Sequence, residues 1–122
     1  MAEQLGTPWL RCHVRITCEE SLEELAGKIS SSLLGGIKFN ATPIYDEVPC
    51  MQLNKDILGL RVLLYGLGGE QGFEFKFRPE TWKHKDSGDE TDMSHYIAEI
   101  VRRLLNVKVV VMEYPKTPPL SS

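Results

Sequence analysis

The sequence lacks the patterns that mark disulfide-rich, zinc-binding and membrane-spanning proteins. It holds three cysteines, Cys12, Cys18 and Cys50, and no two of them form a Cys-x-x-Cys pair. No apolar run approaches the length that crosses a bilayer, and the first residues have neither the positive start nor the apolar run of a secretory signal. We therefore expect reduced thiols, no metal site, no membrane segment and a cytoplasmic location.

Motifs for catalysis and for cofactors are also missing. The histidines His13, His84 and His95 stand in no recognised nucleophile and base arrangement. The loop 66–72 is rich in glycine, as phosphate-binding loops are, but it leads into a strand-like stretch rather than a helix, which favours a hairpin connection. The acidic stretch 86–92 lacks the ligand spacing of a calcium loop. We expect a non-catalytic protein without a cofactor.

The composition that remains is that of an ordinary globular domain. The 122 residues are 42% hydrophobic and 25% charged, with a net charge of -3 and a pI of about 5.6. This length suits one hydrophobic core, so we assign residues 1–114 to a single α/β domain. Residues 115–122, with two adjacent prolines, are expected to be extended or disordered. The negative charge disfavours nucleic acid and anionic membranes as bulk partners and favours a basic protein.

The first half of the chain predicts a strand, a helix and a weaker strand. Residues 10–18 alternate between apolar and polar side chains, as a half-buried strand does. Ser21 and Glu24 form a capping-box pattern ahead of a helix over residues 21–34, and a glycine pair ends that helix. Residues 44–53 contain a proline and follow another, which predicts an irregular strand at the edge of a sheet.

The second half predicts a hairpin, a helix and a last strand. Residues 58–65 and 73–78 alternate on either side of the glycine-rich loop. Residues 93–105 carry a broad apolar stripe at helical spacing, with Asp92 or a near neighbour as the cap. The run 107–112 is apolar and β-branched, which predicts an interior strand covered on both faces. The expected fold is an α/β (α+β) two-layer sandwich, a mixed five-stranded sheet with both helices on one face, in the order β-α-β-β-β-α-β.

The chain resembles the small cytosolic immunity proteins of bacterial contact-dependent growth inhibition and related polymorphic toxin systems. The resemblance lies in its small size, net negative charge, plain α/β pattern and missing catalytic motifs. Those proteins neutralise toxin domains by occluding their sites. The resemblance implies a stoichiometric toxin inhibitor whose partner is the C-terminal toxin domain of a secreted effector, expected to be a nuclease. Acidic side chains would then dock on the basic substrate cleft of the nuclease, because opposite charge speeds encounter.

Clustered acids are therefore the candidate partner-binding residues. The polar stretch before the second helix comes first because a loop can adapt to a cleft, and the acids near the hairpin loop come next. Trp82 is a candidate aromatic anchor, although a tryptophan there equally suits the edge of the core. The candidate acids are Asp86, Asp89, Glu90, Asp92, Glu70 and Glu74.

Two other functions stay open on the sequence. The polar sides of three predicted strands carry cationic side chains, and neighbouring strands would join them into a basic sheet face that suits RNA or nucleotide binding. Glu74 interrupts this stripe, however, and cross-strand Arg–Glu pairing on an exposed sheet explains the same residues. A small enzyme that uses His13 or a glutamate is the third interpretation. The cationic residues are Arg11, Arg15, Arg61, Lys76 and Arg78.

Overall fold

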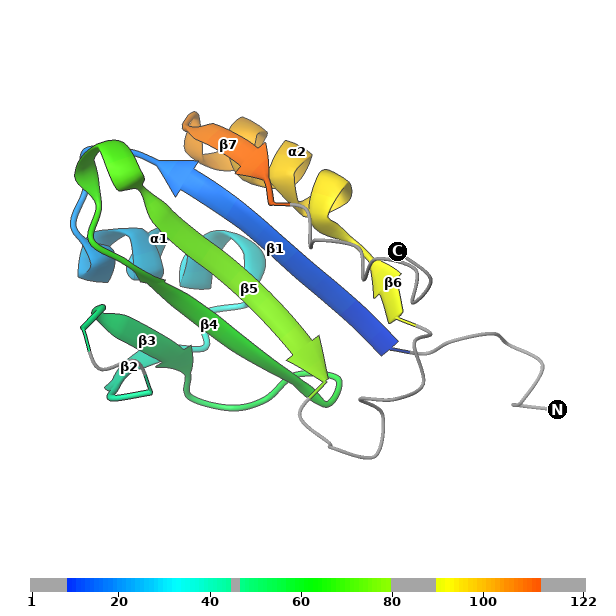
Figure 1. The fold of residues 1–122 in the computed structure, drawn as a ribbon. Coiled ribbons are helices and arrows are strands. Elements are labelled where there is room, and N and C mark those ends of the chain that lie inside the picture. Colours follow the sequence, from blue (N-terminus) through cyan, green and yellow to red (C-terminus); the bar gives the residue numbers. More distant parts are fainter. Residues whose placement is uncertain (1–8, 45–46, 80–89, 113–122) are drawn as a thin grey trace, which may run out of the picture.

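The chain folds into a seven-stranded sheet with two helices, as the computed structural model of residues 9–44, 47–79 and 90–112 shows (Figure 1). The predicted α+β class is therefore confirmed. The elements in chain order are β1 (Trp9–Thr17), α1 (Leu22–Leu33), β2 (Phe39–Thr42), β3 (Cys50–Leu53), β4 (Leu60–Gly66), a 3-10 turn η2 (Gly69–Gln71), β5 (Phe73–Pro79), β6 (Glu90–Asp92), α2 (Ser94–Leu105) and β7 (Lys108–Val111).

Strand β1 organises the pairing of the sheet. The strands lie in the order β2-β3-β4-β5-β1-β6, and β7 also pairs with β1. The pairing of β1 with β6 is parallel and the others are antiparallel. Strand β6 pairs with residues 9–11 of β1 and β7 with residues 14–17, so both lie on the edge of β1 that faces away from β5 (Figure 1). Neither strand pairs with residues 12 and 13.

One face of the sheet and both helices enclose the core. The alternation of β1 turns its apolar side chains to this face, where they pack against residues of α1 and α2. Both helices therefore cover the same face, as predicted, and no helix of the described residues covers the other face (Figure 1). Fully buried members of this core are Cys12, Val14, Ile16, Leu25, Ile29, Ala98 and Val101.

The first helix begins where predicted because its cap forms. The Ser21 hydroxyl accepts a hydrogen bond from the Glu24 amide at 3.1 Å, and the Glu24 carboxylate accepts one from the Ser21 amide at 3.0 Å. This reciprocal box satisfies two free amides at the start of α1. The N-cap of α2 is Met93, the near neighbour of Asp92, and it makes no side-chain cap bond; Asp92 lies one residue earlier and accepts from the Ser94 amide at 2.9 Å. Asn106 ends that helix in the left-handed conformation.

The predicted strand count was wrong, because two strands are too short to show alternation. Strand β2 has four residues and β6 has three. They form by pairing with β3 and with β1, and the local sequence does not reveal this pairing. Strand β3 was also misplaced, since it lies between β2 and β4 rather than at the edge. Pro49 comes just before this strand, so no proline interrupts its ladder.

The prediction that residues 107–112 form an interior strand was also wrong. In the described part of the sheet β7 pairs with β1 alone, and Val110 is 48% exposed. Tyr96 and Leu104 belong to the apolar stripe expected over residues 93–105, but both are exposed. The part of the stripe that packs on the core is therefore narrower than the sequence suggests. Apolar side chains at the edge of a small core are commonly exposed, because a folded protein has too little polar surface to cover its whole exterior.

Several predictions fall on residues that the structure does not describe. The domain boundary at residue 114, the tail 115–122 and most of the polar loop, residues 80–89, lie outside the described residues. Within residues 9–44, 47–79 and 90–112, no helix has both the length and the apolar composition needed to cross a membrane.

Candidate functional site

The sheet face away from the helices collects the polar side chains of three strands. Strands β4, β5 and β1 lie side by side, so their cationic side chains share one face of the sheet, with Leu63 and Glu74 among them. Arg61 of β4 lies opposite Arg78 of β5, and Lys76 of β5 lies opposite His13 of β1. We call this surface, with Arg11, Arg15, Arg61, Lys76 and Arg78, the open face.

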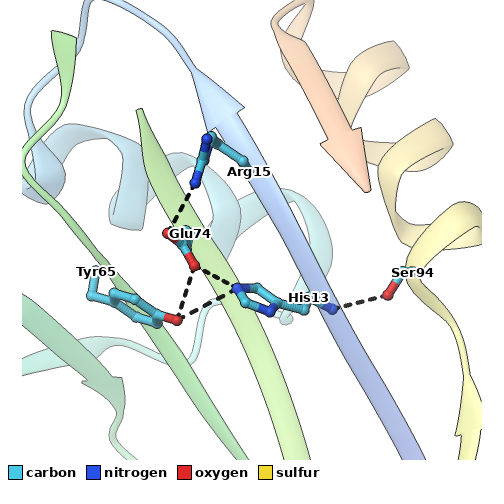
Figure 2. A network of polar contacts seen from close by, with 5 residues as sticks. All are labelled: His13, Arg15, Tyr65, Glu74 and Ser94. Carbon is cyan, nitrogen blue, oxygen red and sulfur yellow. Dashed lines mark hydrogen bonds and ion pairs between the residues drawn. The ribbon is translucent and has the colours of Figure 1, made fainter. Parts of the chain in front are cut away.

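A network of polar side chains occupies the open face (Figure 2). The His13 ring contacts Glu74 with 2.5 Å between Nε2 and Oε1, and the Tyr65 hydroxyl donates to the same oxygen at 3.1 Å. The Arg15 guanidinium lies 3.5 Å from the other carboxylate oxygen, Oε2. Glu74 thus joins side chains from β1 and β4 across the strand between them.

The contacts of Glu74 decide its protonation state. Burial opposes its ionisation, since its side chain is only 25% exposed. The hydrogen bond and charge of His13, followed by the Tyr65 bond and the Arg15 charge, outweigh burial and hold the pKa of Glu74 below its ordinary 4.5. Glu74 is therefore a carboxylate at neutral pH and serves as an acceptor.

The backbone of His13 is also anchored. Its amide donates to the hydroxyl of fully buried Ser94 at 2.9 Å (Figure 2). That hydroxyl donates to Asp92 at 2.5 Å. Burial opposes the ionisation of Asp92, but the Ser94 bonds and the Arg11 charge help to hold its pKa below the ordinary value. Ser94 thus supplies an acceptor to β1 between its contacts with β6 and β7.

A small pocket of about 250 Å³ lies beside the network. Three members of the network face it, and the loop between β4 and β5 closes its other side. Its walls combine charged groups, an amide side chain, an aromatic ring and apolar side chains. The residues around it are Arg15, Val48, Tyr65, Gly66, Leu67, Gln71, Gly72 and Glu74.

A larger groove of about 790 Å³ opens where β1 leads into α1 and β4 turns toward β5. Its floor and rim include apolar surface, with Leu67 62% exposed. No Lys, Arg or His of the described residues lines it. Lys28 of α1 contacts one of its acids, Glu20. We call this feature the acidic groove, after its carboxylates Glu19, Glu20, Glu23 and Glu70.

The structure separates the candidate acids that it describes. Glu70 lies on the acidic groove, whereas Glu74 belongs to the network on the open face. Asp92 is held by Ser94 and Arg11. Glu90 pairs through β6 with Trp9, and its side chain lies outside the described part. Asp86, Asp89 and Trp82 lie entirely outside the described residues.

The buried thiols behave as apolar groups. Burial raises the pKa of Cys12 to about 12 and that of Cys50 to about 11, so neither forms a thiolate at neutral pH. Cys18 is partly exposed and lines the acidic groove. The described ranges contain no cluster of three His, Cys, Asp or Glu side chains that could hold a metal ion.

The network around Glu74 was not recognised in the sequence. Arg15 and Glu74 do pair across strands, as the cross-strand alternative predicted. The interpretation of Glu74 as an interruption of a basic stripe missed that it is the hub that joins three partners. The available signal was that His13, Arg15, Tyr65 and Glu74 all occupy polar positions of alternating strands. Strand register, which local sequence does not give, decides which of them meet.

Comparison with known proteins adds no family to these observations. No protein-family model, curated protein or solved structure matches the chain. The functional inference therefore rests on two hollows with different chemistry, the acidic groove and the small pocket. They share Gly66 and Leu67 at the end of β4.

Proposed function

We propose that this protein is a non-catalytic inhibitor of the immunity type, which neutralises the toxin domain of a secreted effector by stoichiometric binding. The acidic groove carries the proposal. It gathers Glu70 with the glutamates of the segment that leads into α1, and it presents apolar Leu67 beside them. A basic, partly apolar segment of a partner, such as the rim of a nuclease cleft, complements this surface.

The energetics of such docking follow from the exposure of the groove. Single exposed ion pairs contribute only about 0–1 kcal/mol, because water screens them and side chains lose freedom. Several carboxylates in one concave surface instead raise the rate of encounter and disfavour acidic partners. Binding strength must come from apolar contacts that are buried on docking, for which exposed Leu67 is the available anchor.

Co-expression tests this proposal. The probe is the C-terminal domain of a secreted effector whose gene adjoins the gene of this chain, and the readout is growth of cells that express it. The chain should restore growth, and Glu23→Gln combined with Glu70→Gln should weaken protection. The matched control, Asp56→Asn with Glu99→Gln, also removes two exposed negative charges, but away from the groove. Equal protection by both double variants, or no protection by the natural chain, contradicts the proposal.

The other candidate acids stay predictions for the same partner. Asp86→Asn with Asp89→Asn tests the acids of the predicted polar loop in a variant of its own, apart from Glu23 and Glu70. Asp92 is a poor choice for a binding test, because its carboxylate already serves Ser94 and Arg11 within the fold. Replacing Asp92 would change the start of α2 along with any contact to a partner. Trp82→Ala tests the predicted aromatic anchor.

RNA or nucleotide binding is the second candidate function, and the adjacency of β4, β5 and β1 favours it. This order unites the cationic side chains of three strands on one sheet face, where single-stranded RNA can lie with its bases against side chains. Binding to a short single-stranded RNA should weaken steeply as salt rises and should fall in Arg61→Ala. Two results together would favour this candidate over the inhibitor. The chain would bind RNA at physiological salt, and the groove variants would protect toxin-expressing cells as well as the natural chain does.

A further inference from the structure

The small pocket holds hydrogen-bonding capacity that the described fold leaves unused. The Arg15 side chain is 40% exposed, and its polar partner is Glu74 Oε2 at 3.5 Å. Its Nε is buried and has no hydrogen-bond partner among the described residues, so the exposed part of the guanidinium is what can reach a ligand. The Glu74 oxygens are unequal, since Oε1 has two partners, His13 and Tyr65, whereas the partner of Oε2 within the described part of the chain is Arg15. A strong donor group and a charged acceptor thus lie side by side at the wall of a hollow.

The other walls suit a flat ring. Tyr65 offers an aromatic surface, and Val48 and Leu67 offer apolar contacts. Glycine at position 72 lets this wall pack closely against β1, because a Cβ there would lie 2.8 Å from the Ile16 carbonyl oxygen and 3.2 Å from Cγ of Arg15. At about 250 Å³ the hollow is smaller than the range of about 300–1,000 Å³ for drug-sized ligands, so a single ring system is the expected occupant.

We propose that this pocket binds the guanine base of a single-stranded RNA or a guanine nucleotide. The inference rests on the second candidate function and names its specific ligand. Guanine presents the carbonyl oxygen O6, an acceptor for arginine, next to N1–H and the N2 amine, two donors for a carboxylate. Arg15 donates to O6, and Glu74 Oε2 accepts from the N–H edge, while Tyr65 contacts the ring.

The surroundings supply charge for the phosphate of the same nucleotide. Lys76 lies on β5 two residues beyond Glu74, on the same open face. It has no ion-pair partner among the residues that the structure describes. A phosphate bound there adds affinity that is independent of the base, because lysine contacts phosphate as a point charge.

Titrations with the four 5′-monophosphates GMP, AMP, CMP and UMP, followed by amide NMR of the full chain, test the proposal. GMP should bind at least about ten-fold tighter than the others, because guanine uses both Arg15 and Glu74. It should also move the amide resonances of Gly66, Gln71 and Gly72. Equal affinity for all four nucleotides, a preference for another base, or shifts confined to other regions would overturn the pocket assignment.

Two variants separate the base contact from the phosphate contact. Arg15→Lys keeps the positive charge but loses the planar fork, so it should abolish the preference for GMP while the protein still binds single-stranded RNA. Lys76→Ala lies outside the pocket lining and should weaken all four nucleotides by a similar factor. Retained guanine preference in Arg15→Lys contradicts the pocket. RNA binding without base preference overturns the pocket alone, whereas no binding of RNA or nucleotides overturns the second candidate function as well.

Discussion

His13 and Glu74 meet diagonally across two neighbouring strands, with His13 Nε2 2.5 Å from Glu74 Oε1. In the register of β1 and β5, Glu74 lies directly opposite Arg15, and His13 lies opposite Lys76. Diagonal neighbours on one sheet face are within reach of long side chains. The contact links the open face to α2, because the backbone amide of the same histidine donates to Ser94.

The lowered pKa of Glu74 predicts a pH-dependent share of stability. A group whose folded pKa lies below its unfolded value stabilises the fold above the unfolded pKa, near 4.5, and loses this contribution as pH falls through the folded pKa. Glu74→Gln should therefore lower the free energy of unfolding by about 1–3 kcal/mol at pH 7, and by less near pH 3. Urea unfolding across pH 3–7 measures this difference.

Glu99→Gln serves as the control for this pH series. Glu99 pairs with Arg102 and Arg103 on exposed helix surface, so its replacement should change stability by less than about 1 kcal/mol throughout. A cost of Glu74→Gln that stays constant from pH 7 to pH 3 would show that its partners do not stabilise the ionised form.

Ser94→Ala should destabilise the protein by about 1–3 kcal/mol, because it leaves the His13 amide without its acceptor and removes the hydroxyl that donates to Asp92. The exposed Ser31→Ala is a matched control, expected to lie within about 0.5 kcal/mol of the natural protein. Chemical unfolding followed by circular dichroism compares the two. Equal stability of both variants would mean that Ser94 does not support β1 at this point.

Two glycines predict opposite effects of the same substitution. Gly66 has φ 143°, and a Cβ there would lie 2.6 Å from the Gly72 carbonyl oxygen, so Gly66→Ala should cost at least about 1–3 kcal/mol. Gly27 lies in α1 with no atom within 4 Å of a Cβ, so Gly27→Ala should stabilise by about 0.5–1 kcal/mol. Melting temperatures show whether each variant is less or more stable than the natural protein. Destabilisation by Gly27→Ala would contradict the open surroundings described for that helix position.

Thiol labelling at pH 8 tests the burial of the cysteines. Cys18, partly exposed at the acidic groove, should react first, whereas burial and raised pKa values should keep Cys12 and Cys50 slow. All three should react rapidly in urea. Labelling of Cys12 as fast as that of Cys18 in the folded protein would contradict the described core.

Local signals in the sequence were sufficient for the elements with strong periodicity or caps. The Ser21 and Glu24 box located the start of α1, and the alternation around the glycine-rich loop located β4 and β5. The short strands β2 and β6 were not predictable, because three or four residues carry no period, and β6 in addition pairs with β1 at the other end of the chain. The shortness of these two strands therefore accounts for the wrong strand count.

The candidate site shows the same division. The sequence pattern placed cationic residues on the correct strands and Glu70 in the correct loop. It did not show that the segment before α1 approaches the β4–β5 connection, and this approach forms the acidic groove. Glu70 was among the candidate acids, whereas Glu19, Glu20 and Glu23, which also line the groove, were not. The role of Glu74 as an internal acceptor depends on the register of β1, β4 and β5, which only the folded sheet fixes.

Calorimetric titration of the purified chain with the effector's C-terminal toxin domain tests the central claim most directly. The acidic groove predicts a one-to-one complex whose affinity falls at least about ten-fold in Glu23→Gln with Glu70→Gln and weakens with salt. The control Asp56→Asn with Glu99→Gln should bind as the natural chain does, and bound toxin should protect Cys18 from labelling. Unchanged affinity of the groove variant, with Cys18 equally reactive in the complex, would contradict the claim.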